Sequence, residues 1–301
     1  MKKWLVAIRA PFFTASLAPV VVGVAVAFYE GVRIHWLNAI LSLIGVVALH
    51  AGTNLANDYF DHRSKNDWVN KTPTSFSGGS RVIQQGLLTP RAVLIYALAC
   101  FAVGSAIGIY LWRVTPGNVV LMIGVVGVLS GLLYTAAPVA IGYRGFGELF
   151  IGLNFGVLAV LGAHYVQAGH LSLAAGLASL PVAALIAAVV YINEFPDYEA
   201  DKEVHKRTLV VLLGLKNARW GYYGLIAFTY LSIAAAVALH YLPLWALLGM
   251  LTLPLAAKAV TVLVKDYAQP YKLLPANGLT ILVHIATGLL VAAGMVIGKL
   301  A

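Results

Sequence analysis

The chain has 301 residues, of which 61% are hydrophobic and only 10% charged, and its mean hydropathy is +0.87. Because soluble domains carry about 25% charged residues, this composition excludes a soluble fold and places most of the chain in lipid. The formal net charge of +9 does not indicate nucleic-acid binding, since Lys and Arg flank the apolar segments instead of forming one basic patch.

Nine apolar segments follow one another along the chain. A helix that crosses a bilayer needs about 20 mostly apolar residues, and segments of this length are too long for the strands of a membrane barrel. We therefore predict an all-α, polytopic membrane protein that forms a single domain over residues 1–301. The predicted spans cover roughly residues 10–29, 37–57, 92–112, 118–136, 148–167, 173–192, 218–239, 244–264 and 277–299.

The distribution of Lys and Arg predicts the orientation of these spans, because cytoplasmic connections carry an excess of both residues. The N-terminal end and the even-numbered connections hold sixteen Lys and Arg, whereas the odd-numbered connections and the C-terminal end hold three. We therefore expect a multi-pass protein of the cell membrane whose N-terminus and two large loops face the cytoplasm.

The second predicted span ends in an acidic segment. Asn54, Asn57, Asp58 and Asp61 fall at positions i, i+3, i+4 and i+7, which share one face of a helix. Asp67 follows in the loop. Ionisable groups at membrane depth are costly, so these residues are candidates for a functional site.

The sixth predicted span ends in the same way. Asn193, Asp197 and Asp201 fall at i, i+4 and i+8, again on one face, and the two segments together hold eight of the eleven acids. We expect Pro196 to break or kink the helix here. The two segments lie four spans apart and both begin with Asn, which is consistent with an internal repeat of four-helix units around a central cavity.

Carboxylates placed so close together repel one another, and a bound cation would reverse that repulsion. Carboxylate and amide oxygens suit Mg²⁺, with Mn²⁺ as an alternative ion, and Mg²⁺ commonly bridges to substrate phosphates. Nearby cations stabilise a departing diphosphate, although sorting of positive charge to the cytoplasm also explains each of them. The basic residues near the two segments are Arg63, Lys65, Arg81, Lys202, Lys206 and Arg207.

A secondary transporter is the competing function, because intramembrane acids, kinked helices and repeats also occur in transporters. Transporter sites lie near the bilayer midplane, whereas these acids gather at one end of the spans with basic companions. A non-catalytic scaffold gives no reason to concentrate acids at such a cost. Motifs for nucleotide binding, serine hydrolysis or thiol redox chemistry are absent from the sequence.

Two motifs, NDYFD (57–61) and DYEAD (197–201), end the second and sixth predicted spans, and RAPFFTASLAPVVVG (9–23), YRGFGE (143–148) and TLVVLLG (208–214) accompany them. With these motifs the sequence resembles, over nearly its whole length, the UbiA superfamily of intramembrane aromatic prenyltransferases. Within the superfamily, NLANDYFD followed by FSGGSRVIQQGLL resembles the menaquinone branch, typified by 1,4-dihydroxy-2-naphthoate prenyltransferase.

The resemblance implies a nine-helix bundle around a central cavity, with a cytoplasmic polar cap and a side opening to lipid. It also implies transfer of a prenyl group from an isoprenoid diphosphate to an aromatic acceptor. Asp58, Asp61, Asp197 and Asp201 are the implied catalytic residues, and with Asn57 they are the candidate metal ligands; Asp58 is also the candidate base for the acceptor hydroxyl. The candidates for binding diphosphate are Arg9, Asn54, Asn57, Lys65, Arg81, Tyr134, Arg144, Asn193, Lys202 and Arg207.

The chain departs from the family pattern at Gly142, where many relatives carry a Lys that helps to hold diphosphate. Arg144 is the candidate replacement. The segment 76–88 favours the naphthoate as acceptor, while 4-hydroxybenzoate, homogentisate, a haem or chlorophyll precursor and an ether-lipid glycerol remain alternatives. Neither the length of the prenyl chain nor the oligomeric state follows from the sequence.

Overall fold

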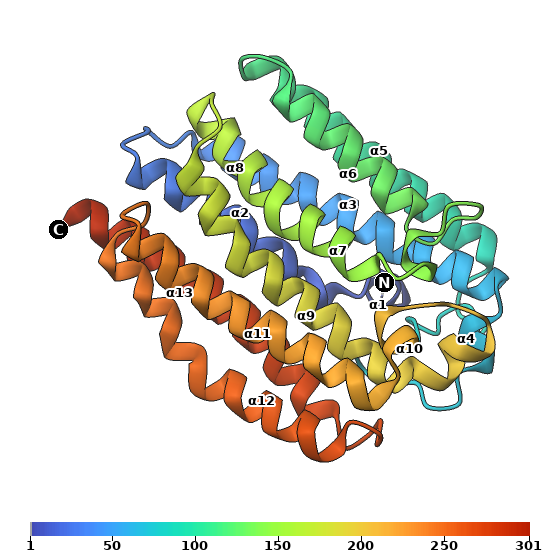
Figure 1. The fold of residues 1–301 in the computed structure, drawn as a ribbon. Coiled ribbons are helices and arrows are strands. Elements are labelled where there is room, and N and C mark those ends of the chain that lie inside the picture. The colour runs from blue at the N-terminus through green and yellow to red at the C-terminus, as the bar shows by residue number, and fades with distance from the viewer. Residues whose placement is uncertain (1) are drawn as a thin grey trace.

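The computed structural model describes residues 2–301, and its regular structure in that range is helical throughout (Figure 1). Eight of the described helices are long and apolar enough to cross a membrane. They confirm the predicted all-α polytopic class and eight of the nine predicted spans. These helices are Ala10–Tyr29 (α2 with the turn before it), α3 (Trp36–Arg63), α5 (Pro90–Val114), Gly147–Ala168 (α7 to α8), α9 (Leu173–Glu203), α11 (Leu215–Ala238), Leu244–Asp266 (α12 with the turn before it) and α13 (Leu274–Leu300).

The fourth predicted span is shorter than expected. Helix α6 (Val119–Leu133) has 15 residues, which at 1.5 Å per residue cover about 22 Å of a hydrocarbon core of about 30 Å. The helix ends before Tyr134, ahead of Pro138. Proline disfavours the helical conformation in the residue before it, here Ala137, so the helix does not resume in the residues that lead to Pro138.

The two acid-bearing helices are longer than the apolar pattern predicts. Helix α3 continues to Arg63 and α9 continues to Glu203, so each acidic segment lies on the last turns of a spanning helix. Of the break or kink predicted at Pro196, the break is wrong, because α9 runs through this residue. A proline in a helix leaves the carbonyl four residues earlier without its N–H partner. Here Asn277 Nδ2 donates to that carbonyl, of Ile192, at 3.2 Å.

The spanning helices run side by side along one direction (Figure 1). Helices α2 and α9 pack against each other and against several neighbours, whereas α5 and α6 lie along one edge and α12 along the opposite edge. The short helices α1 (Lys2–Ala7), α4 (Asn66–Val69) and α10 (Leu209–Leu213) gather near one end of the bundle, and the C-terminus lies at the other. The acidic ends of α3 and α9 therefore meet beneath a cap of short helices and loops.

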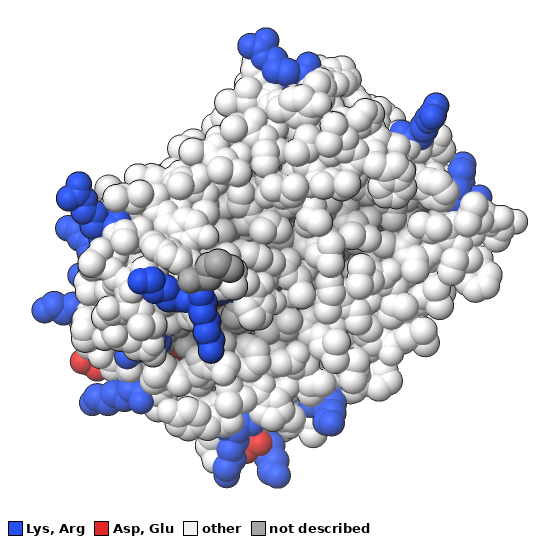
Figure 2. Space-filling model, turned by 180° about the vertical axis from the view of Figure 1, so that it is seen from behind, with Lys and Arg blue, Asp and Glu red and all other residues white. Residues whose placement is uncertain are grey.

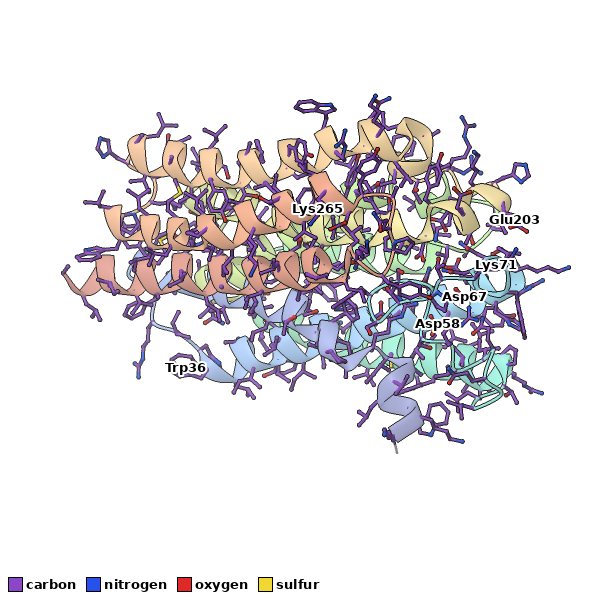
Figure 3. The ribbon with its side chains drawn as sticks, turned by 90° about the horizontal axis from the view of Figure 1, so that it is seen from below. Trp36, Asp58, Asp67, Lys71, Glu203 and Lys265 are labelled. Carbon is purple, nitrogen blue, oxygen red and sulfur yellow. The ribbon has the colours of Figure 1, made fainter. Side chains whose placement is uncertain are left out.

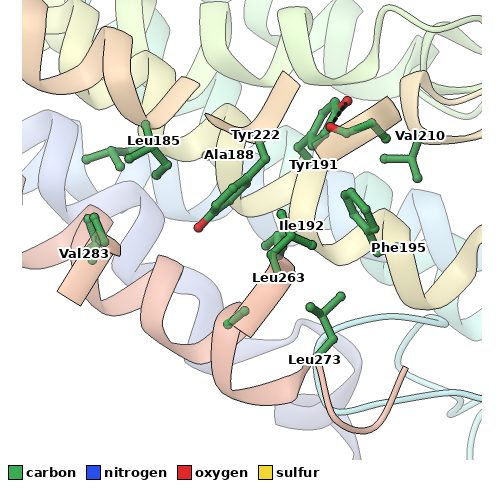
Figure 4. Packing of buried hydrophobic residues seen from close by; sticks show 14 of the residues in the cluster. Leu185, Ala188, Tyr191, Ile192, Phe195, Val210, Tyr222, Leu263, Leu273 and Val283 are labelled. Carbon is green, nitrogen blue, oxygen red and sulfur yellow. Dashed lines mark hydrogen bonds between the residues drawn. The ribbon is translucent and has the colours of Figure 1, made fainter. Parts of the chain in front are cut away.

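The C-terminal half of α9 is held by a core of buried apolar residues shared with α11, α12 and α13 (Figure 4). Tyr191 and Tyr222 are almost fully buried within this cluster. The Tyr191 hydroxyl donates to the Ala218 carbonyl at 2.9 Å, and the Tyr222 hydroxyl pairs with Thr280 Oγ1 at 2.7 Å. Both hydroxyls are hydrogen-bonded inside the core. The side of α9 that carries Tyr191 is therefore packed against α11 and its neighbours, and the opposite side is free to face a cavity.

Charged side chains are rare over much of the surface. On the face shown in Figure 2, most Lys and Arg lie near the margins or toward one end, and they leave a broad uncharged area between them. Many large apolar side chains, such as Leu231 and Leu251, are exposed there or on other faces. This distribution is expected for a surface whose middle band contacts lipid.

Candidate functional site

A polar cavity of about 190 Å³ lies at the capped end of the bundle. Its walls come from α3, α9 and the loop that follows α3. In Figure 3 the labelled residues Asp58, Asp67 and Glu203 lie toward this end, whereas Trp36, at the start of α3, lies at the opposite end. The cavity is therefore built where the two acidic segments meet.

The α3 wall of the cavity presents Asn57 and Asp61, one helical turn apart. Asn57 Nδ2 donates to Asp61 Oδ2 at 3.1 Å, and Asn57 Oδ1 accepts from Arg9 Nη2 at 3.2 Å. The Arg9 guanidinium also pairs with Asp58, which further accepts from the Ser80 backbone N–H at 3.2 Å. Asp58 is thus engaged by Arg9 and the loop, while Asp61 lines the cavity.

The α9 wall presents Asp197 and Asp201, again one turn apart. Asp197 accepts from Asn70 Nδ2 at 2.7 Å and from the Gly78 N–H at 3.0 Å. Asp201 Oδ1 accepts from Asn66 Nδ2 at 2.9 Å. The loop after α3 is therefore tied to the acids of α9 by neutral donors.

Lys206 joins the two walls. Its Nζ lies 3.7 Å from Asp61 Oδ2 and 3.5 Å from Asp201 Oδ1, and 5.3 Å from the centre of the Tyr143 ring. The Tyr143 hydroxyl donates to Asp61 Oδ1 at 2.6 Å. Burial alone lowers the pKa of Lys206, but the charges of Asp201 and Asp61 outweigh it and the net pKa is well above its usual value. Lys206 is therefore a fixed cation inside an acidic cavity.

Asp67, in the short helix α4, completes the acidic lining. Burial, followed by the negative charges of Asp61 and Asp58, raises the pKa of Asp67 to about 8. Gly79 lies against this carboxyl group with φ +75°, and a Cβ there would be 2.6 Å from Asp67 Oδ2. Only glycine fits this approach without displacing the acid.

The donor set suits a hard divalent cation, although no three His, Cys, Asp or Glu side chains within residues 2–301 are gathered closely enough to hold one. Each acid is instead held separately by an amide, a hydroxyl or Lys206. Asp201 Oδ2 is buried and has no hydrogen-bond partner. Oxygen ligands from Asn57, Asp61, Asp197 and Asp201 that line one cavity, with one oxygen unsatisfied, fit Mg²⁺.

The predicted candidates divide into three groups. Those that line the polar cavity are Arg9, Asn54, Asn57, Asp61, Tyr134, Asn193, Asp197 and Asp201. Two others lie just behind it: Asp58 is paired with Arg9, and Arg81 donates to the main-chain carbonyl of Asp67. The candidates whose side chains are exposed and outside the lining are Lys65, Arg144, Lys202 and Arg207.

The proposed replacement of the family Lys by Arg144 has no support in the geometry. Arg144 Nη2 donates to the carbonyl of Pro138 at 2.6 Å, on the exposed side of its turn. Besides Arg9, the cation in the cavity is Lys206, one of the basic residues noted beside the second acidic segment. The chain reaches back from the end of α9 to place it there, and Arg207 N–H donates to the Tyr143 carbonyl at 3.0 Å.

Several cavity residues lie where the helical pattern gives no signal. Asn66, Asn70 and Gly78 contact the α9 acids from the loop after α3, whose conformation no periodicity predicts. His50 follows the same face of α3 one turn deeper than Asn54, and extending the i, i+4 pattern backward would have found it. Glu194 precedes Asp197 by one turn and was visible only as part of an acidic run.

A second, apolar cavity of about 410 Å³ adjoins the polar one. It is lined mainly by aliphatic residues and glycines of α3, α5, α6 and α8. The two cavities share Thr53, Tyr134, Ile151 and Phe155 in their linings. Phe155 belongs to a π-helical turn (Gly152–Leu158), a feature that re-aims side chains and often occurs at functional sites. The shared residues mark a passage from an acidic chamber to an apolar one.

The fold and the cavity define a polytopic helical membrane protein with an acid-lined chamber at one end of its bundle. The sequence profile described as the UbiA prenyltransferase family matches residues 16–274. The chain therefore belongs to the UbiA prenyltransferase family, which confirms the resemblance found in its acidic segments.

Relatives with curated names match along most of the chain. A 1,4-dihydroxy-2-naphthoate octaprenyltransferase of Mycobacterium tuberculosis is 30% identical over 298 residues, covering 99% of this chain and 98% of the relative. A protein of the same name from Bacillus subtilis is 29% identical over 284 residues, covering 94% of this chain and 89% of the relative. The names of these relatives support the resemblance to the menaquinone branch.

Solved structures share the fold at lower sequence identity. A UbiA homolog from Archaeoglobus fulgidus, solved bound to DMAPP and Mg²⁺, matches with a TM-score of 0.64 and 19% identity over 97% of this chain and 99% of its own. The apo structure of a UbiA homolog from Aeropyrum pernix matches with a TM-score of 0.66 and 18% identity, over 95% and 97%. Another structure of the Archaeoglobus protein contains Cd²⁺. These matches establish the fold.

Proposed function

We propose that this chain transfers a polyprenyl group from an isoprenoid diphosphate to an aromatic acceptor, with Mg²⁺ as its metal ion and Mn²⁺ as an alternative. The observation that carries the proposal is the pair of adjoining cavities. One is acidic with two partly buried cations, Arg9 and Lys206, and the other is apolar. A substrate with a charged diphosphate and a long hydrocarbon tail matches this division.

Asn57, Asp61, Asp197 and Asp201 would hold Mg²⁺ in the polar cavity. The ion would neutralise charge on the diphosphate as the allylic C–O bond breaks. Lys206 and Arg9 lie beside these acids and would stabilise the same departing charge. Of the chain's own side chains, these two would supply the positive charge that stabilises the departing diphosphate.

The residues shared by the two cavities would meet the reacting carbon. The rings of Tyr134 and Phe155 line both chambers, and Phe155 lies 4.7 Å from the His50 ring, centre to centre. Aromatic faces stabilise a nearby carbocation. The apolar walls exclude water, which would otherwise capture the cation as an alcohol.

The preferred acceptor is 1,4-dihydroxy-2-naphthoate. Its support is the naming of the Mycobacterium and Bacillus relatives, together with segment 76–88, which contributes Phe76, Ser77, Gly78 and Gly79 to the polar cavity. Prenylation of this acceptor is accompanied by loss of its carboxylate. We also propose that the capped end faces the cytoplasm, because sixteen of the Lys and Arg residues are predicted on that side against three on the other.

The test is prenyl transfer by the purified protein in detergent with Mg²⁺ and farnesyl or geranylgeranyl diphosphate. The naphthoate would be compared with 4-hydroxybenzoate, in parallel with EDTA and with Asp61→Ala and Asp201→Ala. Metal-dependent product on the naphthoate alone, lost in both variants, is the expected result. Product on another acceptor would keep the reaction and change the substrate. Folded protein that releases no diphosphate with any acceptor would contradict the proposal and favour transport.

A further inference from the structure

Glu194 is a buried acid of the polar cavity that the proposed diphosphate site does not use. Its side chain lines the cavity, it is 9% exposed, and its Oε2 has no hydrogen-bond partner. It lies three residues before Asp197 on α9, toward the interior of the bundle. An acid left unsatisfied at such depth is costly, and that cost points to a ligand.

Glu194 forms a pair with Glu148, the last residue of the YRGFGE segment. The two carboxyl groups lie close enough for their charges to act on each other, and Oε2 of each is buried without a hydrogen-bond partner. Glu148 is 3% exposed, and its Oε1 accepts from the Leu209 N–H at 3.2 Å, which fixes it against the start of α10. A neighbouring carboxylate favours the protonated form of an acid. Glu148 therefore makes Glu194 a stronger proton acceptor.

The pair lies beside the passage between the two cavities. Tyr134 lines both chambers, and a Cβ on Gly147, next to Glu148, would lie only 2.8 Å from the Tyr134 hydroxyl oxygen. The allylic carbon joins the diphosphate to the hydrocarbon tail, so it must occupy this same passage when both ends are bound. The ring carbon of the acceptor must reach the allylic carbon there.

The other candidate bases near the passage are engaged by the protein or assigned to the metal ion. Asp58, the candidate base predicted from the sequence, is paired with Arg9 and accepts from Ser80. His50 Nδ1 pairs with Ser16 Oγ at 2.9 Å, and the His50 ring packs between Phe13 and Phe155. Asp197 and Asp201 are bound by loop amides and would hold the metal ion.

We propose that Glu194 binds the hydroxyl group of the acceptor and takes its proton, which makes it a catalytic residue of the proposed prenyl transfer. The inference rests on the proposed function and goes beyond it by assigning the acceptor side of the site. It replaces Asp58 in the role of base.

The step balances with no further reactant. The allylic C–O bond breaks and its electron pair leaves with the diphosphate. The acceptor's carboxylate-bearing ring carbon forms the new C–C bond, while the hydroxyl proton passes to Glu194 and leaves a ketone. Carbon dioxide then departs, its bonding electron pair returns through the ring to that oxygen, and the oxygen takes the proton back from Glu194.

The test compares Glu194→Gln with Glu203→Gln, an exposed acid of the same helix. Product formation by Glu194→Gln is expected to fall at least about 100-fold, as for loss of a general base. KM for the prenyl diphosphate should stay within a factor of about two, because the diphosphate side is intact, and the rate should partly recover at high pH as the acceptor ionises in solution. Glu203→Gln should behave as wild type.

Three outcomes would overturn the inference while leaving the proposed function intact. The first is activity of Glu194→Gln near the wild-type level at every pH. The second is a loss that comes entirely from a higher KM for the prenyl diphosphate. If Glu194→Gln does not fold, Glu148→Gln decides: a shifted pH profile of product formation supports a base that lies beside Glu148, and an unchanged profile is the third overturning outcome. Failure of the proposed function would differ, since the wild-type protein itself would give no product.

Discussion

The two ends of the bundle hold their acids in opposite ways. At the end of α2 remote from the cap, Glu30 Oε2 pairs with His164 Nε2 at 2.7 Å, and Glu30 Oε1 accepts from Ser172. Both oxygens are engaged by the protein. At the capped end, Asp201, Glu148 and Glu194 each keep one buried oxygen without a partner. An acid whose oxygens are both hydrogen-bonded within the protein stabilises the fold, whereas a cluster of acids with unpaired oxygens can still bind a ligand.

The surroundings sharpen the difference. Glu30 pairs with the fully buried His164 of α8 and with Ser172 in the turn before α9. It therefore joins the end of α2 to both of these elements. The capped end concentrates acids around one lysine, an arrangement whose internal repulsion a metal ion and a diphosphate complex would reduce. Substitutions at the two ends should therefore separate activity from stability.

The largest effect is expected for Asp201→Asn, which keeps the size of the side chain and removes its charge. Activity should fall at least about 100-fold, because a ligand of the metal ion and the charge that orients it are lost. Thermal unfolding gives an independent readout. Mg²⁺ with a non-reacting diphosphate should raise Tm of the wild-type protein by mass action and should not raise Tm of the variant. Equal stabilisation of both proteins would remove Asp201 from the metal site.

Lys206→Met should have the next largest effect. This variant keeps an apolar stem but leaves Asp61 and Asp201 without their shared cation. We expect a fall in kcat of about 10- to 100-fold, since a cation beside the departing diphosphate is lost. Tm without metal should also fall, because carboxylate repulsion rises. Lys202→Met, an exposed cation four residues earlier, is the matched control and should change neither quantity.

Glu30→Ala should affect stability alone. It removes the acceptor from His164, which has no solvent-exposed surface, and from Ser172. Leaving a buried donor unsatisfied costs about 1–3 kcal/mol, so the free energy of unfolding should fall by about that amount. Activity of the folded fraction should stay within a factor of about two. A loss of kcat at a temperature where the variant is fully folded would show that the two ends are coupled.

Much of the fold was predictable because lipid imposes simple rules. Span length, apolar composition and the spacing of Asn57, Asp58 and Asp61 determine eight spans and one wall of the cavity. The end of α6 and the course of α9 through Pro196 were mispredicted, because they depend on local backbone geometry and on Asn277, a tertiary partner 85 residues from Ile192.

The cations of the site were harder to predict than its acids. In membrane proteins, acids within spans are rare and therefore indicate a functional site wherever they occur. Lys and Arg, in contrast, commonly flank the cytoplasmic ends of spans because they determine topology. Lys65, Lys202 and Arg207 are basic like Lys206 and lie equally close to an acidic segment in the sequence. Of these four residues, only Lys206 lines the polar cavity. That choice is made by the backbone after α9, which no helical period describes.

The smallest effect is expected for Arg144→Met, which tests the correction most directly. The Arg144 side chain is exposed and donates to Pro138 on the outer side of its turn, so its loss should leave kcat and KM for the prenyl diphosphate within a factor of about two. Lys206→Met under the same assay supplies the contrast. A fall of 10-fold or more in Arg144→Met would mean that the turn closes over the diphosphate during the reaction. That result would give Arg144 the role of the Lys that many relatives carry at the position of Gly142. A side chain at position 142 would be crowded in this structure, because its Cβ would lie only 3.0 Å from the nearest carbons of the Tyr134 ring.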